Sequence, residues 1–163
     1  ARGRDLPRRH ALRRRGGALH DLLGVGHLLL RMEREGLTNI RIAHHDAVAV
    51  VSRWLPPAAL DEDLVFFPDP WHKKRHHKRR LVQPEFLEQL ARVMVPGARL
   101  HLATDWAPYA ERMLEVGEGS PHFENTVPGG GYAPRPDTRP QTKFERRGLK
   151  LGHEVFDLVY RRT

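Results

Sequence analysis

The sequence predicts an α/β fold built on a mainly parallel sheet, and two patterns carry that prediction. Amphipathic stretches of helical length alternate with short apolar strands along most of the chain. Parallel strands need such helical crossovers, so the alternation favours a parallel sheet with helices on its faces. In addition, an acidic residue stands just after each of three predicted strands, as is typical of sheets that bind ligands at their carboxyl edge.

The first half of the chain contains one predicted helix and two predicted strands. Residues 25–35 carry apolar side chains on one helical face, and Gly36 is placed to end that helix. The stretch "NIRIAHHDA" predicts a short strand around residues 39–43. The stretch "DLVFFPD" predicts a buried strand around residues 63–67, which Pro68 ends because proline cannot continue the ladder.

The second half continues the alternation. Pro84 fits the first turn of a helix, and Pro96-Gly97 is expected to close it. The stretch "ARLHLATD" predicts a strand around residues 98–103, and Pro108 opens another helix. Residues 117–141 form a loop rich in glycine and proline, and "EVFDLVYR" forms a closing strand. Because that strand follows a long loop, it is free to enter the sheet antiparallel.

Charge is unevenly distributed. The chain of 163 residues has a formal net charge of +8 and no cysteine. The absence of cysteine excludes disulfides and thiolate metal sites, and no apolar run reaches the ~20 residues of a membrane span. We therefore expect a cytoplasmic protein that does not enter membranes. A cluster of six lysines and arginines interleaved with histidines, "WHKKRHHKRR", follows Pro70 and suits a polyanion such as RNA, or else is a solvated loop.

Residues 1–23 differ from the remainder. They contain seven arginines, no lysine and little periodicity of either kind, so we treat them as an atypical segment, disordered or out of frame. The organised domain then covers residues 24–163.

Asp46, Asp69 and Asp105 are the three acids that follow predicted strands, and together they suggest a polar ligand pocket. The alternative is that each of them caps a helix or ties down a turn. Asp69 is the most suggestive because Pro68 and Pro70 restrict the backbone on both sides of it. Neither a Walker loop nor an H-E-x-x-H zinc motif is present, and we expect no metal site.

Four stretches carry a recognisable pattern: "FFPDPWHKKRHHKRRL", "ATDW", "PRPDTRPQTKFERRG" and "LGH" before the last strand. They resemble the bacterial tRNA (guanine-N7-)-methyltransferase family over about residues 24–162. The resemblance implies a class I, Rossmann-like methyltransferase sheet that uses S-adenosylmethionine and acts on guanine in the variable loop of tRNA. It also implies tRNA as the partner and favours a monomer.

The resemblance also implies roles for individual residues. Asp69 corresponds to the active-site acid, and Asp46 to a contact near the adenine of the cofactor. The residues that correspond to substrate contacts are Lys73, Asp105, Thr142, Lys143, Phe144 and Glu145. The surface that corresponds to the tRNA-backbone contact consists of Arg75, His76, His77, Lys78, Arg79 and Arg80.

The implied chemistry agrees with the residues. Guanine N7 is a free lone pair at neutral pH, so no strong general base is needed. Methyl transfer leaves positive charge on the purine, and a fixed carboxylate, Asp69 or Asp105, can accept from guanine N1 and N2 and stabilise that charge. Trp71 or Phe144 could stack on a base, or each could belong to the core.

The family pattern is interrupted at the amino-terminal side. The family carries a glycine-rich cofactor loop and then a second acid, and the position of that acid here holds Leu19. We therefore expect the sheet to be incomplete on this side, through a frame change, a truncation or degeneration. The alternative function that follows is a non-catalytic RNA-binding protein that has lost its cofactor site.

Overall fold

The computed structural model describes residues 9–11 and 18–163, with side chains from residue 24 onward except those of residues 143 and 144. Within these described residues, five strands form one sheet in the order β1-β2-β3-β5-β4. The strands are β1 (Arg9–Ala11), β2 (Leu60–Phe66), β3 (Met94–Thr104), β4 (Phe123–Asn125) and β5 (Phe156–Arg162).

Strand directions confirm the predicted α/β class. The first three strands in that order, β1, β2 and β3, pair in parallel. In contrast, β5 runs antiparallel to both β3 and β4, as expected for a strand that returns from a long loop. The segment 1–23 contributes β1 and the start of helix α1 (Ala18–Glu35).

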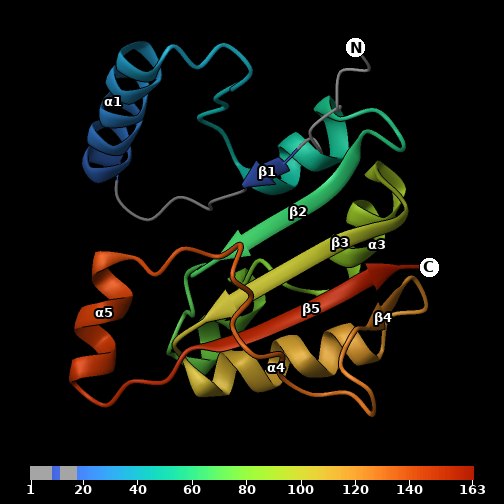
Figure 1. Cartoon of the computed structure of the whole chain (residues 1–163). Helices are drawn as coiled ribbons and strands as arrows, with labels where there is room; N and C mark the ends of the chain where they lie inside the picture. Colours follow the sequence, from blue (N-terminus) through green and yellow to red (C-terminus); the bar gives the residue numbers. More distant parts are fainter. Residues whose placement is uncertain (1–8, 12–17) are drawn as a thin grey trace.

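Two helices cover one face of the sheet (Figure 1), α3 (Pro84–Val93) and α4 (Ala107–Glu118). The apolar face of α3 is buried, including Phe86, Leu87 and Leu90. Each helix has proline in its first turn, where the missing amide proton costs nothing. Helix α4 approaches β5 closely, because a Cβ on Gly117 would lie 2.3 Å from the Tyr160 ring.

Two predictions from the first half of the chain need correction. Residues 39–43 form no strand; they precede a short helical segment made of α2 (Ala47–Ala49) and a π-helical turn, η1 (Val50–Trp54). The reason is that β1 already occupies the edge of β2. The three residues of β1 in turn offer too short an edge for residues 39–43 to pair with. Asp46 therefore does not follow a strand.

The strand β3 begins earlier than predicted. Pro96 and Gly97 lie inside β3 rather than after α3, at an irregularity where the register with β2 shifts between Leu60 and Glu62. Gly97 has φ of +83°, a conformation that glycine adopts without steric cost. The bulge thus lets a Pro-Gly pair stand within a strand.

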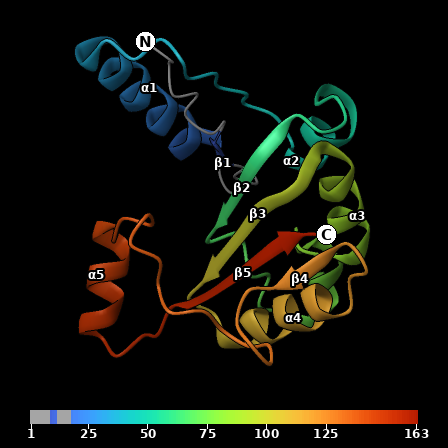
Figure 2. The ribbon, with the colours of Figure 1, turned by 45° about the vertical axis from the view of Figure 1, so that its right-hand side comes forward.

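The helices α1 and α5 (Lys143–Lys150) stand apart from the layer formed by α3 and α4. Figure 2, turned by 45°, again shows both of them clear of that layer. Several leucines of α1 are exposed, and none of the described helices combines the length and hydropathy of a membrane span.

Candidate active site

A pocket opens at the carboxyl ends of β2 and β3, where the sequence predicted a ligand crevice. Its volume is about 880 Å³, within the range typical of small-molecule sites. The strand ends, the start of α4 and the segments around α5 contribute its lining, which consists of Phe66, Phe67, Pro68, Pro70, His72, Asp105, Trp106, Ala107, Pro108, Thr142 and His153.

The loop that follows β2 is held in a strained conformation. Phe67 has φ of +50° and Trp71 has φ of +46°, values that bulky side chains rarely adopt. Between them, Asp69 Oδ1 accepts a hydrogen bond from the Trp71 amide at 3.0 Å. Backbone strain of this kind is concentrated at functional sites, where the surrounding structure holds it in place.

Among the predicted acids, Asp105 is the one that lines the pocket. It follows β3 directly, and the next amide, that of Trp106, donates to Thr104 Oγ1 at 3.3 Å. The Trp106 ring is 37% exposed and meets His72 edge-on, with ring centroids 4.3 Å apart. The pocket therefore places a carboxylate beside exposed aromatic surface, an arrangement suited to a planar base with hydrogen-bond donors on its edge.

Asp69 lies beside the pocket rather than in its lining, since Pro68 and Pro70 form the wall on either side of it. Its carboxylate supports the turn at Trp71, which was the alternative that the sequence left open. Asparagine could make the same contact, so the turn alone does not require a charge.

A buried ionic cluster links the start of α5 to β5 through Arg139. Glu145 accepts two hydrogen bonds from Arg139, at 2.7 and 2.8 Å, and Asp157 accepts one more at 2.9 Å. Asp157 Oδ1 also lies 2.7 Å from His101 Nε2. Burial alone would lower the pKa of Arg139, but the two carboxylates outweigh it and the pKa is raised. Arg139 therefore stays charged.

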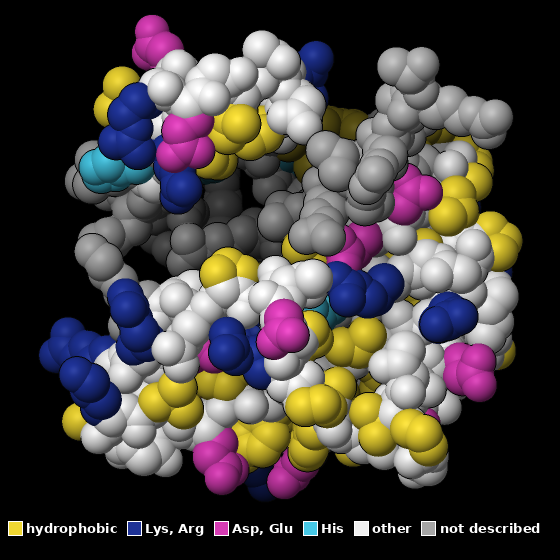
Figure 3. All heavy atoms as spheres, in the orientation of Figure 1, with side chains coloured by type: hydrophobic (Ala, Val, Ile, Leu, Met, Phe, Trp, Pro, Cys, Tyr) yellow, Lys and Arg dark blue, Asp and Glu magenta, His cyan; other side chains and the backbone are white. Residues whose placement is uncertain are grey.

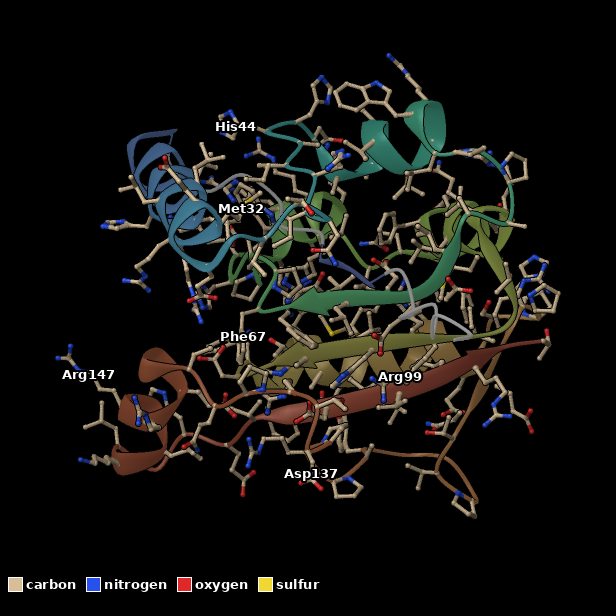
Figure 4. The ribbon with its side chains drawn as sticks, turned by 45° about the horizontal axis from the view of Figure 1, so that its top comes forward. Met32, His44, Phe67, Arg99, Asp137 and Arg147 are labelled. Atoms are coloured by element: carbon tan, nitrogen blue, oxygen red, sulfur yellow. The ribbon has the colours of Figure 1, made fainter. Side chains whose placement is uncertain are left out.

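This ionic cluster lies next to two aromatic residues that line the pocket. The Arg139 guanidinium lies 6.0 Å from the Phe66 ring and 5.9 Å from the Phe67 ring, and both rings line the pocket. Thr142 caps α5 by accepting from the Glu145 amide at 3.1 Å, and it also lines the pocket. Figure 4 shows Phe67 at the end of β2, while Arg147 projects from α5 away from the sheet. The side chains at 143 and 144 lie outside the described residues.

The basic cluster after Pro70 forms a 3-10 helix, η2 (Lys74–Arg79). Most of its side chains, including Lys78, are exposed, as is Lys73 before the helix, whereas Arg80 after it is 5% exposed. Trp71 packs against this helix: its ring meets His76 edge-on at 5.7 Å, and the Arg79 guanidinium lies 5.1 Å from it. Trp71 is thus half-buried beneath the basic surface instead of standing free to stack.

Asp46 does not line the pocket. Its Oδ1 accepts from the Ala49 amide at 3.1 Å, so it caps the helical segment that begins at Ala47. Leu19 lies near the start of α1, and the backbone alone is described for residues 18–23.

Several pocket residues were not predicted from the sequence, namely Phe66, Phe67, His72, Trp106 and His153. The signal for Trp106 was present, because it follows Asp105 in the "ATDW" stretch. A second basic surface was also missed: Arg146, Arg147 and Lys150 are exposed on α5, where Figure 3 shows basic side chains gathering at one end of the molecule.

Comparison with known proteins places these features in a family. Residues 21–158 match the family described as "Putative methyltransferase". The chain is 60% identical over 140 residues to the tRNA (guanine-N(7)-)-methyltransferase of Paracidovorax citrulli, covering 86% of this chain and 55% of that protein. It is 58% identical over 140 residues to the Streptomyces avermitilis protein of the same name, covering 86% of this chain and 48% of that protein. The chain thus spans about half the length of the curated relatives it matches.

Solved structures show the same fold at low sequence identity. A methyltransferase homolog from Pyrococcus horikoshii matches with a TM-score of 0.55 at 14% identity, over 88% of this chain and 51% of that one. A Streptococcus mutans protein described as "a putative methyltransferase", solved in complex with SAH, matches with a TM-score of 0.50 at 12% identity, over 94% of this chain and 88% of that one. Both likenesses support the Rossmann-like sheet of a class I methyltransferase.

Proposed function

Because the chain belongs to the methyltransferase family that includes the tRNA (guanine-N(7)-)-methyltransferases, we propose that it methylates N7 of a guanine in the variable loop of tRNA. The methyl donor in this proposal is S-adenosylmethionine. Because the proposed substrate is tRNA, we also propose that the protein acts in the cytoplasm. The observation that carries the proposal is Asp105 in an aromatic-walled pocket at the carboxyl edge of the sheet.

Asp105 is the residue that we assign to the guanine. A carboxylate accepts hydrogen bonds, and guanine presents donors at N1 and N2 on the edge away from N7. When N7 gains a methyl group the purine becomes cationic, and a carboxylate already in place lowers the energy of that state without reorganising. Guanine N7 carries no proton, so the reaction needs no general base at this atom.

The remaining residues position the substrate. Trp106 and His72 offer aromatic surface on which the base can lie, since exposed rings stack on any base. Asp69 holds the strained turn and adds negative charge beside the pocket. Glu145 acts through Arg139, because both of its oxygens are already engaged, and it thereby fixes Thr142 at the pocket wall.

S-adenosylmethionine supplies an electrophilic methyl group when bound. Asp46 is the described residue that we assign to it, and the fit is partial because Oδ1 of this carboxylate already caps a helix. The family's second acid corresponds to Leu19, whose side chain cannot accept a hydrogen bond.

The basic surface holds the tRNA. Lys73, Arg75, Lys78 and Arg79 are exposed next to the pocket, and contacts of this type bind phosphates and set the register without reading sequence. A non-catalytic RNA-binding protein is not favoured, because the curated relatives at about 60% identity carry the name of a methyltransferase.

The test is methylation of unmodified tRNA with isotopically labelled S-adenosylmethionine, followed by nucleoside analysis with mass spectrometry. We expect label in 7-methylguanosine from the variable loop. Label in another nucleoside would overturn the assignment of the target atom, and tRNA binding with no transfer at any cofactor concentration would favour the non-catalytic alternative.

A further inference from the structure

A second, smaller cavity lies beside the active-site pocket, between η2 and α4. Its volume is about 250 Å³, and its lining consists of His77, Lys78, Arg80, Gln83 and Arg112. Each of these side chains can donate hydrogen bonds, and none of them is an acid. The first three belong to the basic surface predicted from the sequence, whereas Gln83 and Arg112 do not.

Arg80 forms the rigid floor of this cavity. It is 5% exposed, and its Nε donates to the Pro70 carbonyl at 2.8 Å. Its guanidinium lies 4.7 Å from the Tyr109 ring centroid, and Nη2 lies 3.2 Å from His77 Nε2. An arginine held on both an aromatic face and a backbone carbonyl loses little further entropy when it binds an anion.

Arg112 adds a second positive charge from α4. Its side chain is 35% exposed and pairs with Glu115, which is 69% exposed, at 2.8 Å. Burial lowers the pKa of Arg80, the neighbouring Tyr109 opposes this change, and the charge of Arg112 lowers the pKa again. The two guanidinium groups therefore repel each other, and an anion between them would relieve that repulsion.

The cavity lies one helical turn along α4 from the active-site pocket. Pro108 lines the active-site pocket and Arg112 lines the second cavity, so the two sites are separated along α4 by one helical turn, about 6 Å. Pro70 also connects them, because it lines the first site and its carbonyl accepts from Arg80 in the second. A nucleotide whose base enters the active-site pocket would bring its own backbone to this cavity.

We propose that Arg80 and Arg112 form a dedicated phosphate site that binds the tRNA phosphodiester next to the target guanine. This inference rests on the proposed function for the identity of the ligand. It differs from the general basic surface in three ways: it is a single depression, its two guanidinium groups come from separate elements, and it lies next to the active-site pocket. Arginine is suited to this task because its planar donors match phosphate oxygens.

The test compares Arg112→Ala with Arg161→Ala, which removes the same charge from an exposed residue near the opposite end of the sheet. Affinity for tRNA is measured as a function of salt concentration. We expect Arg112→Ala to weaken binding several-fold at low salt and to reduce the salt slope by about 0.7–0.9, the value of one phosphate contact. Arg161→Ala should leave that slope unchanged.

A second measurement uses inorganic phosphate and the side-chain Nε–H resonances of arginine in nitrogen-15-labelled protein. Saturable millimolar shifts of Arg80 and Arg112 that disappear in Arg112→Ala support the site. If tRNA binds but both alanine variants behave alike and phosphate causes no saturable shift, the inference is wrong while the proposed function stands. If phosphate saturates the site but tRNA does not bind, the anion site stands and the proposed substrate is wrong.

Discussion

Arg139 and Glu145 face each other across a contact that solvent barely reaches: both side chains are 2% exposed, and two hydrogen bonds of 2.7 and 2.8 Å join them. Removing one partner of a buried pair is strongly destabilising, and without Glu145 the buried charge of Arg139 would be compensated by Asp157 alone. We expect Glu145→Ala to lower the free energy of unfolding by about 3–5 kcal/mol, measured by denaturant titration. Glu154→Ala, at an exposed position, is the control. A loss below about 1 kcal/mol for Glu145→Ala would show that the pair is not buried in solution.

Asp105→Asn tests the acid inside the pocket. The variant keeps the shape but removes the charge and presents amide protons to the guanine donors. We expect the methylation rate to fall by ~100-fold or more, with little change in tRNA affinity. A rate within a factor of about three of the parent would remove Asp105 from the reaction.

Asp69→Asn provides the contrast at the rim of the same pocket. Asparagine can still accept from the Trp71 amide, so the turn is kept and any effect measures the charge. We expect a fall of ~100-fold in turnover here as well, and unchanged thermal stability. A loss of stability together with activity would instead assign Asp69 to the turn alone.

The exposed part of the basic surface is expected to act through charge. Replacing Arg75, Lys78 and Arg79 by alanine should weaken tRNA binding and flatten its dependence on salt by about 0.7–0.9 per lost phosphate contact. Arg80 is excluded from this set because it donates a hydrogen bond to the Pro70 carbonyl and packs on the Tyr109 ring. Replacing it would therefore disturb the structure as well as the charge. An unchanged slope would separate this surface from RNA.

Asp63 is expected to make stability depend on pH. It is fully buried in β2, neither carboxylate oxygen has a hydrogen bond of normal geometry from the described residues, and burial raises its pKa to about 7. The Leu64 amide opposes that rise and the charge of Glu62 adds to it. Because the folded pKa lies above the unfolded one, the stabilisation is complete below pH ~4 and is lost as pH rises to about 7.

The measurement for Asp63 is the free energy of unfolding of the parent and of Asp63→Asn between pH 4 and pH 8. The parent should lose on the order of 3 kcal/mol relative to the variant over that range. Asp61→Asn, at an exposed neighbour, should follow the parent. Parallel curves for the parent and Asp63→Asn would mean that the buried carboxyl does not titrate there.

Cofactor affinity should respond to residue 19. The resemblance to the family implies an acid at the position of Leu19, and a carboxylate that accepts from ribose hydroxyls contributes about 1.5–3 kcal/mol. We therefore expect Leu19→Glu to tighten S-adenosylmethionine binding by roughly ten- to a hundredfold, measured by calorimetry. Micromolar binding by the unchanged chain, with no gain in the variant, would show that the pocket does not use this position.

The sequence predicted the elements whose signals are local. Pro84 and Pro108 marked helix starts, and the apolar runs ending at Pro68 and Asp105 marked β2 and β3. The sequence-based prediction failed where the availability of a partner strand decides whether a segment forms a strand. Residues 9–11 have no strand pattern, yet they form β1 because β2 offers an unpaired edge, whereas the better pattern at 39–43 finds no partner.

The same division holds for the site. Acids after strands are visible in a sequence, so Asp105 could be placed in the pocket before the structure was known. The role of Glu145 could not, because Arg139 is six residues away in a loop and its burial depends on the whole sheet. Nothing in the sequence marked Arg112 as part of a site, since an arginine on a helix is usually solvated. Its proposed role depends on the nearby Arg80, which belongs to another element.

The order of the strands has a consequence for how the protein is made. The strand β5 follows β3 and β4 in the chain but lies between them in the sheet, and β4 pairs with no other strand among the described residues. During translation, β3 therefore leaves the ribosome with one exposed edge, and the antiparallel half of the sheet cannot assemble until residues 156–162 have emerged. A ribosome that stalls before this point would display an open edge to other nascent chains and to chaperones.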